Sequence, residues 1–246
     1  MTGPSLPETM THGLPVRGSR SMLLETLAPL AGLQVADIGC GDGTWTRLLS
    51  EAGARVVGLD PNDRQLEAAR CAPPVAGETY VKAGAEALPL ADASQDVALF
   101  FNALHHVPAD LMAAALAEAA RVTRAGGMVV AFEPVARGTN FALNQPVDDE
   151  TEIRTLAHRR LHEAADGHLP LALDREFEYV TVSKKRDYAA WKEGQVRISP
   201  SRAARFAADE AGLRAHFDRM LADLPRDDGG NALLDQPMRA TVLRRT

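Results

Sequence analysis

The stretch Val35-Ala-Asp-Ile-Gly-Cys-Gly-Asp-Gly-Thr44 decides the fold of this chain. The apolar run over 33–38 predicts a buried strand, and a helical pattern follows over 44–52. Glycines at alternate positions between them predict a tight turn, because a residue without a Cβ lets the backbone bend sharply and lie against a ligand. Backbone N–H groups and the helix N-terminus would face that ligand. The stretch therefore predicts a strand, a turn and a helix that together form a binding site.

A second predicted strand, over 54–59, ends in an acid. Asp60 lies 23 residues after Asp37, where a strand–helix–strand unit delivers a carboxylate to the two hydroxyls of a ribose. The glycine spacing is G-x-G-x-G, whereas NAD-binding proteins have G-x-G-x-x-G. Asp60 is therefore a predicted ribose ligand, and the alternative is a simple cap at the end of a strand.

Both segments resemble the first two motifs of the class I S-adenosylmethionine (SAM)-dependent methyltransferases, and the resemblance covers roughly residues 33–135. The resemblance is close to the broad subgroup that includes the ubiquinone and menaquinone C-methyltransferases. It implies a doubly wound, Rossmann-like α/β domain over 18–246 with a mainly parallel seven-stranded sheet. The implied activity is in-line transfer of a methyl group from SAM to a small-molecule acceptor, which releases S-adenosylhomocysteine (SAH).

The resemblance also implies which residues contact SAM. Asp37 would order the glycine turn near the ligand's amino group, with a purely structural role as the alternative. Gly84 departs from the family pattern, which often has an acid there to accept from the adenine amino group. A basic residue near the N-terminus, Arg20 or Arg17, would meet the methionine carboxylate. The predicted cofactor-binding residues are Arg20, Asp37, Gly39, Cys40, Gly41, Asp60, Pro61, Gly84, Ala85, Glu86, Asn102 and Ala103.

The catalytic candidates follow the predicted central strand over 96–101. The run Asn102-Ala-Leu-His-His-Val107 is similar to the family's x-L-H-H motif. His105 or His106 could take a proton from the acceptor, since an imidazole titrates near neutral pH. The alternative is that both histidines bond to the backbone and shape the pocket. Glu133 closes the next strand, where it could face the acceptor, although we expect a surface acid at the end of that strand.

Beyond residue 135 the resemblance fades. A polar loop over 137–145 and a helix over 148–165 are predicted within a lid insertion at about 137–175, and a last strand over 238–243 is expected at the sheet edge. His158 and His162 have metal-ligand spacing, but we expect a solvated helix face there and predict no metal site. The segment 182–206 has seven basic residues and two acids, which predicts a basic surface offset elsewhere or a site for an anionic acceptor.

Composition excludes several classes of protein. The 246 residues are 46% hydrophobic, which suits one α/β domain, and the net charge of −6 gives no general attraction to nucleic acid. Only two cysteines occur, Cys40 and Cys71, so we expect no disulfide framework or zinc module and a cytoplasmic location. No apolar run approaches the ~20 residues of a membrane span. Residues 1–17 are predicted to be a flexible arm.

Two alternatives to methyl transfer stay open at this point. One is a protein with the SAM-binding fold that does not methylate, either a regulator or an enzyme for another SAM-dependent group transfer; the departure at Gly84 keeps it open. The other is an NAD(P)-dependent oxidoreductase of the same fold. The glycine spacing and the Ala85-Glu-Ala-Leu-Pro-Leu90 segment argue against the oxidoreductase.

Overall fold

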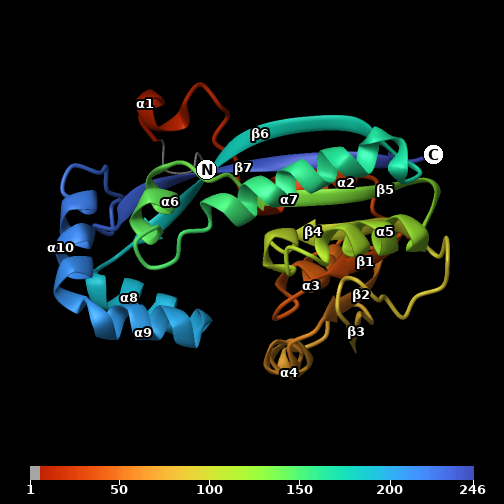
Figure 1. Ribbon diagram of the computed structural model, residues 1–246, viewed down its shortest axis with the longest axis horizontal. Coiled ribbons are helices and arrows are strands. Elements are labelled where there is room, and N and C mark those ends of the chain that lie inside the picture. Colours follow the sequence, from red (N-terminus) through yellow and green to blue (C-terminus); the bar gives the residue numbers. More distant parts are fainter. Residues whose placement is uncertain (1–5) are drawn as a thin grey trace. The chain divides into compact units, whose positions relative to one another are not determined.

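The computed structural model describes residues 6–246 of the chain (Figure 1). The strands are β1 (Gln34–Ile38), β2 (Arg55–Asp60), β3 (Thr79–Lys82), β4 (Gln95–Phe101), β5 (Thr123–Pro134), β6 (Leu171–Lys185) and β7 (Ala232–Arg245). The helices are α1 (Glu8–Thr11), α2 (Ser19–Leu27), α3 (Thr44–Glu51), α4 (Asp63–Cys71), α5 (Met112–Val122), α6 (Thr139–Asn144), α7 (Thr151–Glu163), α8 (Tyr188–Ile198), α9 (Pro200–Ala208) and α10 (Glu210–Leu221). Short turns of other helix types cover Leu104–His106 and Ala164–His168.

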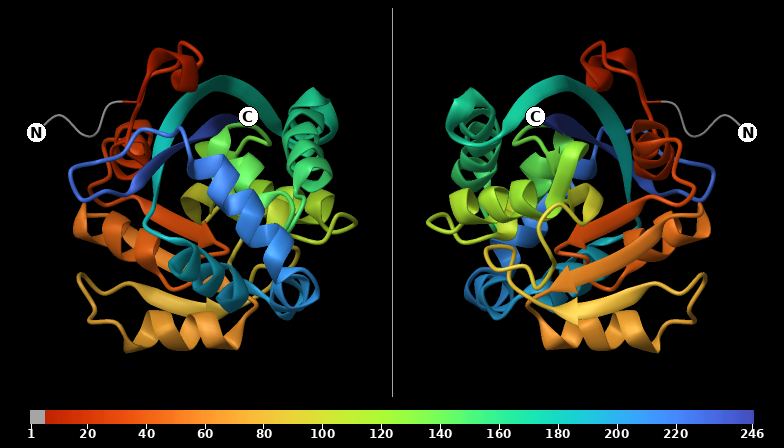
Figure 2. Two further views of the ribbon diagram at one scale, coloured as in Figure 1. Left: turned by 90° about the vertical axis from the view of Figure 1, so that its left-hand side faces the viewer. Right: turned by 90° about the vertical axis from the view of Figure 1, so that its right-hand side faces the viewer.

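The strands form one sheet in the order β3-β2-β1-β4-β5-β7-β6. The pairs β1–β2, β1–β4, β2–β3 and β4–β5 are parallel, and Figure 2 shows β3, β2 and β1 as neighbouring arrows. Every residue of β4 is buried, as expected for a central strand that helices cover on both faces. The order reverses between β1 and β4, which is where an open α/β sheet binds its ligand. The predicted doubly wound α/β fold with seven strands is confirmed.

The described chain divides into two compact units, and the larger one contains the predicted site. It comprises residues 19–134, 153–177 and 239–246. Its core combines β1, β4 and β5 with the apolar face of α5. Ala157 and Leu161 of α7 and Leu171 of β6 belong to the same core. This part of the predicted lid insertion is thus an element of the main core.

The smaller unit comprises residues 6–18, 135–152 and 178–238 of the described chain. Its core is aromatic and gathers side chains of α8, α9 and α10, which group together in Figure 1. Trp191 lies at its centre, with ring centroids 5.2 Å from Phe206 and 5.3 Å from Phe217. Trp191 Nε1 also donates to Asn144 at 2.9 Å, so the indole is satisfied while buried.

Three segments differ from the prediction. Residues 139–144, expected in a loop, form α6, because Asp235 accepts from both the N–H and the hydroxyl of Thr139 at the first turn. β7 is not at the sheet edge: β6 pairs outside it. Of the predicted flexible arm, residues 1–5 lie outside the described part. Residues 6–17 include α1, and Leu6 packs on Val180 and Leu233.

Candidate active site

The turn between β1 and α3 passes so close to a neighbouring loop that its first residue must be glycine. Gly39 has a φ of 75°, and a Cβ there would lie 2.6 Å from the Cβ of Ala103. The N–H groups of Gly39 and Cys40 both donate to the carbonyl oxygen of Leu59, at 2.7 and 3.0 Å. The turn is therefore fixed between the end of β2 and the loop that follows β4.

Asp60 holds the same turn from the end of β2. One carboxylate oxygen accepts the N–H of Gly41 at 2.9 Å, and the other accepts the N–H of Asn62 at 2.8 Å. The side chain is 8% exposed. A carboxylate oxygen has two lone pairs, so each can still accept a further hydrogen bond. Pro61 follows directly and is exposed. Asp60 thus holds the glycine turn, and its contact with a ribose stays a prediction.

Asp37 and Cys40 are buried beneath the turn. Asp37 is 1% exposed, and its carboxylate accepts a 2.6 Å hydrogen bond from the hydroxyl of Thr46. Burial raises the pKa of Asp37 to about 6, against the hydrogen bond from Thr46, which lowers it. Burial, with the charges of Asp37 and Asp60, also raises the pKa of the Cys40 thiol. Cys40 is therefore held as a neutral thiol and is no nucleophile.

The segment after β3 places a carboxylate beside Gly84, where this chain lacks the acid of the family pattern. A Cβ on Gly84 would overlap the carboxylate of Glu86, which folds back over the glycine. The N–H of Ala83 donates to the carbonyl oxygen of Asp60 at 3.2 Å and joins this segment to the end of β2. The absence of a side chain at Gly84 thus makes room for the Glu86 carboxylate. Ala85 lies between them, and its contact with the adenine ring stays a prediction.

Asn102 begins the loop after β4 in an unusual backbone conformation. Its φ is 52°, in the left-handed region that asparagine tolerates better than most residues. Its N–H donates to the carbonyl oxygen of Phe132 at 2.8 Å, and its side chain is exposed. The bend ends β4 and turns the chain toward the glycine turn, where Ala103 meets Gly39.

Glu133, at the end of β5, organises this loop. One oxygen of its carboxylate accepts the N–H groups of Ala103 and Leu104, at 3.1 and 2.9 Å. The other oxygen contacts Nδ1 of His105 closely. Glu133 is 8% exposed, so the expectation of a surface acid is wrong. The Glu133 carboxylate therefore accepts from three buried polar groups of the loop, and buried polar groups need such partners.

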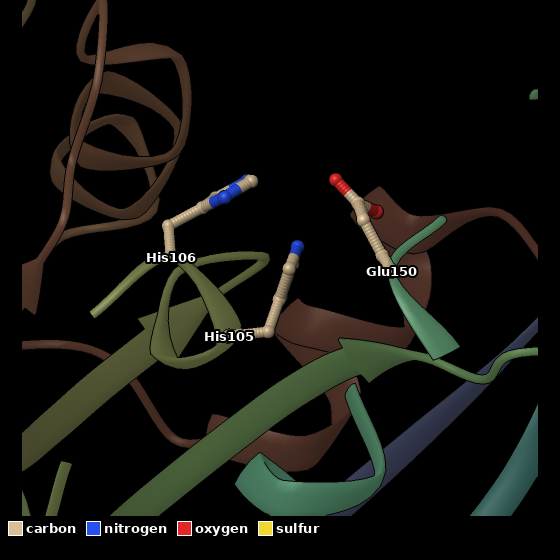
Figure 3. A group of neighbouring side chains, drawn as sticks. All are labelled: His105, His106 and Glu150. Atoms are coloured by element: carbon tan, nitrogen blue, oxygen red, sulfur yellow. The ribbon is translucent and has the colours of Figure 1, made fainter. Parts of the chain in front are cut away.

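The two histidines of the loop differ in environment (Figure 3). His105 is 5% exposed, whereas the side chain of His106 is exposed. Their ring centroids lie 4.0 Å apart. Since Glu133 accepts at Nδ1 of His105, the proton of the neutral ring lies on Nδ1 and Nε2 has the free lone pair. His105 therefore has the tautomer that can accept a proton at Nε2.

Sequence reasoning missed an aromatic wall beside the turn. The ring of Trp45, in the first turn of α3, lies 4.1 Å from that of Phe101, and Phe101 stacks on Phe132 at 5.2 Å. Trp45 is half-buried. Its place directly after the glycine turn was the available signal. Phe101 and Phe132 are buried, so Trp45 is the partly exposed member of this apolar layer at the carboxyl ends of β4 and β5.

Comparison with known proteins identifies the larger unit. The family described as "Methyltransferase domain" matches residues 36–131, which include β2 to β4 and most of β1 and β5. Glu133 lies just beyond the matched residues. Residues 36–131 are therefore assigned to a methyltransferase domain by this match. Malonyl-[acyl-carrier protein] O-methyltransferase of Pectobacterium atrosepticum is 37% identical over 129 residues, 52% of this chain and 49% of that protein. This chain thus matches about half the length of that curated relative.

Solved structures support the fold of the methyltransferase domain. The YcgJ protein of Bacillus subtilis has a TM-score of 0.60 at 18% identity, covering 93% of this chain and 98% of its own. An S-adenosylmethionine-dependent methyltransferase of Mesorhizobium loti has a TM-score of 0.50 at 20% identity, covering 90% and 98%. At such identities the likeness concerns the fold alone. In residues 6–246, no helix combines the length and apolar character needed to cross a membrane.

The predicted basic contact of the methyltransferase domain is engaged elsewhere. Arg20 pairs with Glu51 at 3.1 Å, at the far end of α3 from the glycine turn, and both side chains are mostly exposed. Arg17 belongs to the smaller unit. A contact between Arg20 and the methionine carboxylate therefore stays a prediction and requires the pair with Glu51 to separate.

The basic segment over 182–206 is neutralised within the smaller unit. Lys184 pairs with Asp227 at 2.7 Å, and Lys192 pairs with Glu210 at 2.7 Å. Arg202, which is 8% exposed, pairs with two acids at 2.8 and 2.9 Å. These cations are thus offset by acids of the same unit, so we do not propose the segment as an anion site.

A cavity of about 300 Å³ lies away from the predicted site of the methyltransferase domain. It is lined at the amino ends of the strands by Leu33, Val97 and Met128, together with Arg124. Ligands of such sheets bind at the carboxyl ends. Since Arg124 there pairs with Asp96, we assign this cavity no role in the reaction.

Proposed function

We propose that this protein transfers the methyl group of SAM to a small-molecule acceptor and releases SAH. The observation that carries the proposal is Asp60, a buried carboxylate at the end of β2 that holds the glycine turn and keeps lone pairs for a ribose. The match of residues 36–131 to a methyltransferase family supports the same assignment. Because the match covers part of the chain, the activity of the whole protein must be tested by ligand titration and by assay of acceptors.

The residues present fit SAM. A Cβ at Gly39 would clash with Ala103, so the absence of a side chain keeps the turn close to the loop after β4. Asp60 would accept from the ribose hydroxyls. Ala85 would donate its N–H to the adenine ring, and the carboxylate of Glu86 would accept from the exocyclic amino group.

Bound SAM would supply an electrophilic methyl group that needs no further activation. The protein's part is to hold the acceptor in line, which gives most of the acceleration through proximity, and to exclude water. The aromatic wall of Trp45 and Phe101 supplies a water-excluding surface. Asn102 and Ala103 would border the methionine moiety, because Ala103 lies against Gly39 of the glycine turn and Asn102 directly precedes it.

His105 is the proposed general base for an acceptor that must lose a proton. Its Nε2 would take the proton, and Glu133 would stabilise the imidazolium through Nδ1. Glu133 touches His105 and not the acceptor, so it is a positioning residue. His106 is exposed and would meet the acceptor from the same loop. If the acceptor needs no deprotonation, both histidines shape the pocket instead.

The acceptor class to test first is a carboxylic acid. The relative from Pectobacterium atrosepticum is named for O-methylation of malonyl-[acyl-carrier protein]. A panel for this chain should therefore include acyl-carrier-protein thioesters with a free carboxylate beside free acids, phenols, amines and quinone precursors. Release of SAH, followed by mass spectrometry of the acceptor, reports transfer and the atom methylated.

Calorimetric titration with SAM, SAH and NADH tests the cofactor assignment. We expect SAM and SAH to bind and NADH not to bind. Asp60→Ala should weaken SAH binding by at least about 10-fold, because each hydrogen bond to a charged group contributes about 1.5–3 kcal/mol. The matched control is Asp63→Ala, which removes an exposed acid three residues on that pairs with Lys82. A melting curve of each variant separates loss of binding from loss of fold.

The outcomes also distinguish the alternatives. Tight SAH binding without turnover on the whole panel would favour a non-methylating protein of the same fold. Binding of NADH in place of SAH would favour an oxidoreductase. Tyr188 and Lys192 have the Tyr-x-x-x-Lys spacing of a catalytic pair of some oxidoreductases. Both side chains, however, bind to Glu210 within the smaller unit. The Tyr188 hydroxyl donates to the carbonyl oxygen of Glu210 at 3.3 Å, and Lys192 pairs with the Glu210 carboxylate.

A further inference from the structure

Three potential metal ligands converge within the larger unit, outside the proposed SAM site. His158 and His162 come from α7, and Glu176 comes from β6. The two Nε2 atoms lie 3.1 Å apart. One Glu176 oxygen lies 3.1 Å from Nε2 of His162 and 3.3 Å from Nε2 of His158. The expectation of a solvated helix face considered only the two histidines. β6 adds the carboxylate that the sequence pattern did not place with them.

These separations match the edges of a metal coordination polyhedron. Zn²⁺ binds histidine nitrogen and carboxylate oxygen at about 2.0–2.1 Å, so two ligands of a tetrahedral site are about 3.3 Å apart. Two adjacent ligands of an octahedral site at that bond length would be about 2.9 Å apart. All three distances of the cluster fall between those values.

Hydrogen bonding alone leaves this triangle of atoms unsatisfied. Three mutual contacts need a hydrogen between each pair, and a neutral imidazole carries only one N–H. If His158 and His162 both carried it on Nε2, each could donate to Glu176, but the two nitrogens would lie 3.1 Å apart with no acceptor between them. If only one did, its hydrogen could serve two of the contacts, and the third would join two lone pairs. A cation at the centre satisfies all three lone pairs at once.

The cluster is held in place by its surroundings. The hydroxyl of Thr241 donates to the Glu176 oxygen that faces the histidines, at 2.7 Å. Nε of Arg239 lies 3.9 Å from the other oxygen of the carboxylate. On α7, Leu161 is fixed in the core. Ligand-orienting contacts of this kind are typical of metal sites.

We propose that His158, His162 and Glu176 bind one divalent transition-metal ion, with Zn²⁺ as the best fit. Two imidazoles and one carboxylate suit Zn²⁺ and leave a fourth position open. The ligand side chains are 24–40% exposed, so solvent or a further ligand can reach that position. The ion would join α7 to β6. The site shares no residue with the proposed SAM site.

Zinc titration of the chelator-treated full-length protein tests the proposal. We expect one equivalent of Zn²⁺ to bind and Co²⁺ to give the visible absorption of a low-symmetry site. H162A and E176Q should each weaken Zn²⁺ binding by at least about 10-fold, and T241V by about 10-fold through the freed carboxylate. The matched control is H168A, which removes an exposed histidine six residues beyond His162 and should bind like the wild type.

Two results would overturn the proposal: no stoichiometric Zn²⁺ binding by the wild type, or binding that survives in H162A and E176Q. E176Q keeps the shape of the side chain, so it tests the site even if H162A fails to fold. SAH titration of each variant is the second readout. A variant that loses Zn²⁺ binding but keeps its SAH affinity would show that the metal site and the SAM site are independent. The metal-site proposal and the proposed methyl transfer can therefore be refuted separately.

Discussion

Single residues make contacts in this site that their positions in the sequence do not predict, and Glu133 is the clearest case. It accepts from the N–H groups of Ala103 and Leu104 and contacts His105. Burial would raise the pKa of Glu133, but the charge and hydrogen bond of His105 and the two backbone N–H groups outweigh it, so the pKa is lowered. The carboxylate is therefore held ionised beneath the loop that follows β4.

Glu133→Gln should change the tautomer of His105. The amide oxygen can still accept from the backbone, but its NH₂ group would face Nδ1, so the ring proton would move to Nε2. If His105 is the base, we expect kcat to fall at least about 100-fold with little change in SAM affinity. A change in kcat of only a few-fold would contradict a general-base role. Glu67→Gln, on the exposed face of α4, is the matched control.

Glu133→Gln should also make the free energy of unfolding depend less on pH in the acid range. Because the pKa of Glu133 is lowered by folding, its contribution is present above the unfolded value and is lost as pH falls through the folded value. We expect the variant to lose about 1–3 kcal/mol at neutral pH and less at low pH. Urea unfolding at several pH values measures it, and an equal loss at every pH would contradict the assignment.

Asp37 should act in the opposite direction. Its folded pKa of about 6 exceeds the ordinary 3.8, so its stabilising contribution is complete below about 3.8 and is lost as pH rises through about 6. About two pKa units correspond to about 3 kcal/mol. We expect Asp37→Asn to be more stable relative to the wild type at pH 7.5 than at pH 4, by about that amount. Urea unfolding of the ligand-free protein, with Asp63→Asn as control, tests it; a pH-independent difference would refute the sign.

At the scale of elements, the glycine turn offers a matched pair of substitutions. Gly39 and Gly41 have φ values of 75° and 55°, but a Cβ meets Ala103 at the first and nothing within 4 Å at the second. Gly41→Ala should cost about 1 kcal/mol from backbone strain. Gly39→Ala should cost about 1–3 kcal/mol more from overpacking. Chemical unfolding and SAH titration report both effects, and equal costs would argue against close contact between turn and loop.

Local spacing predicted the elements best where neighbours in sequence are also neighbours in space. The strand over 54–59 and the helix over 44–52 agree with β2 (Arg55–Asp60) and α3 (Thr44–Glu51). The turn and Asp60 were predicted because one strand–helix–strand unit contains both. The place of β7 was wrong, since strand order depends on pairing between distant segments. Glu133 and Glu176 were missed as partners for the same reason: no local pattern links them to His105 and His162.

At the scale of the whole molecule, the smaller unit depends on a buried cation. Arg202 is 8% exposed and bonds to Asp148 at 2.9 Å, Glu150 at 2.8 Å and Gln195 at 2.8 Å. Arg202→Ala would leave the acids without their buried partner, at a cost of about 3–5 kcal/mol. We expect limited proteolysis to cleave first within the smaller unit while residues 36–131 stay protected.

The control for that experiment is Arg197→Ala, which removes an exposed arginine paired with Glu193 one helical turn away. Such pairs contribute about 0.3–0.5 kcal/mol, so cleavage should match the wild type. Equal protection of Arg202→Ala and the control would show that the buried network contributes little. SAH binding by the Arg202 variant would show whether the methyltransferase domain tolerates loss of the smaller unit.

The contrast between the two thiols has a practical consequence. Cys40 is buried beneath the glycine turn with a raised pKa, whereas Cys71 is exposed at the end of α4. Alkylating reagents react with thiolates, so a maleimide dye should attach to Cys71 alone. The natural chain therefore offers a single attachment point for a fluorophore, and a dye there could follow ligand binding without any engineered cysteine.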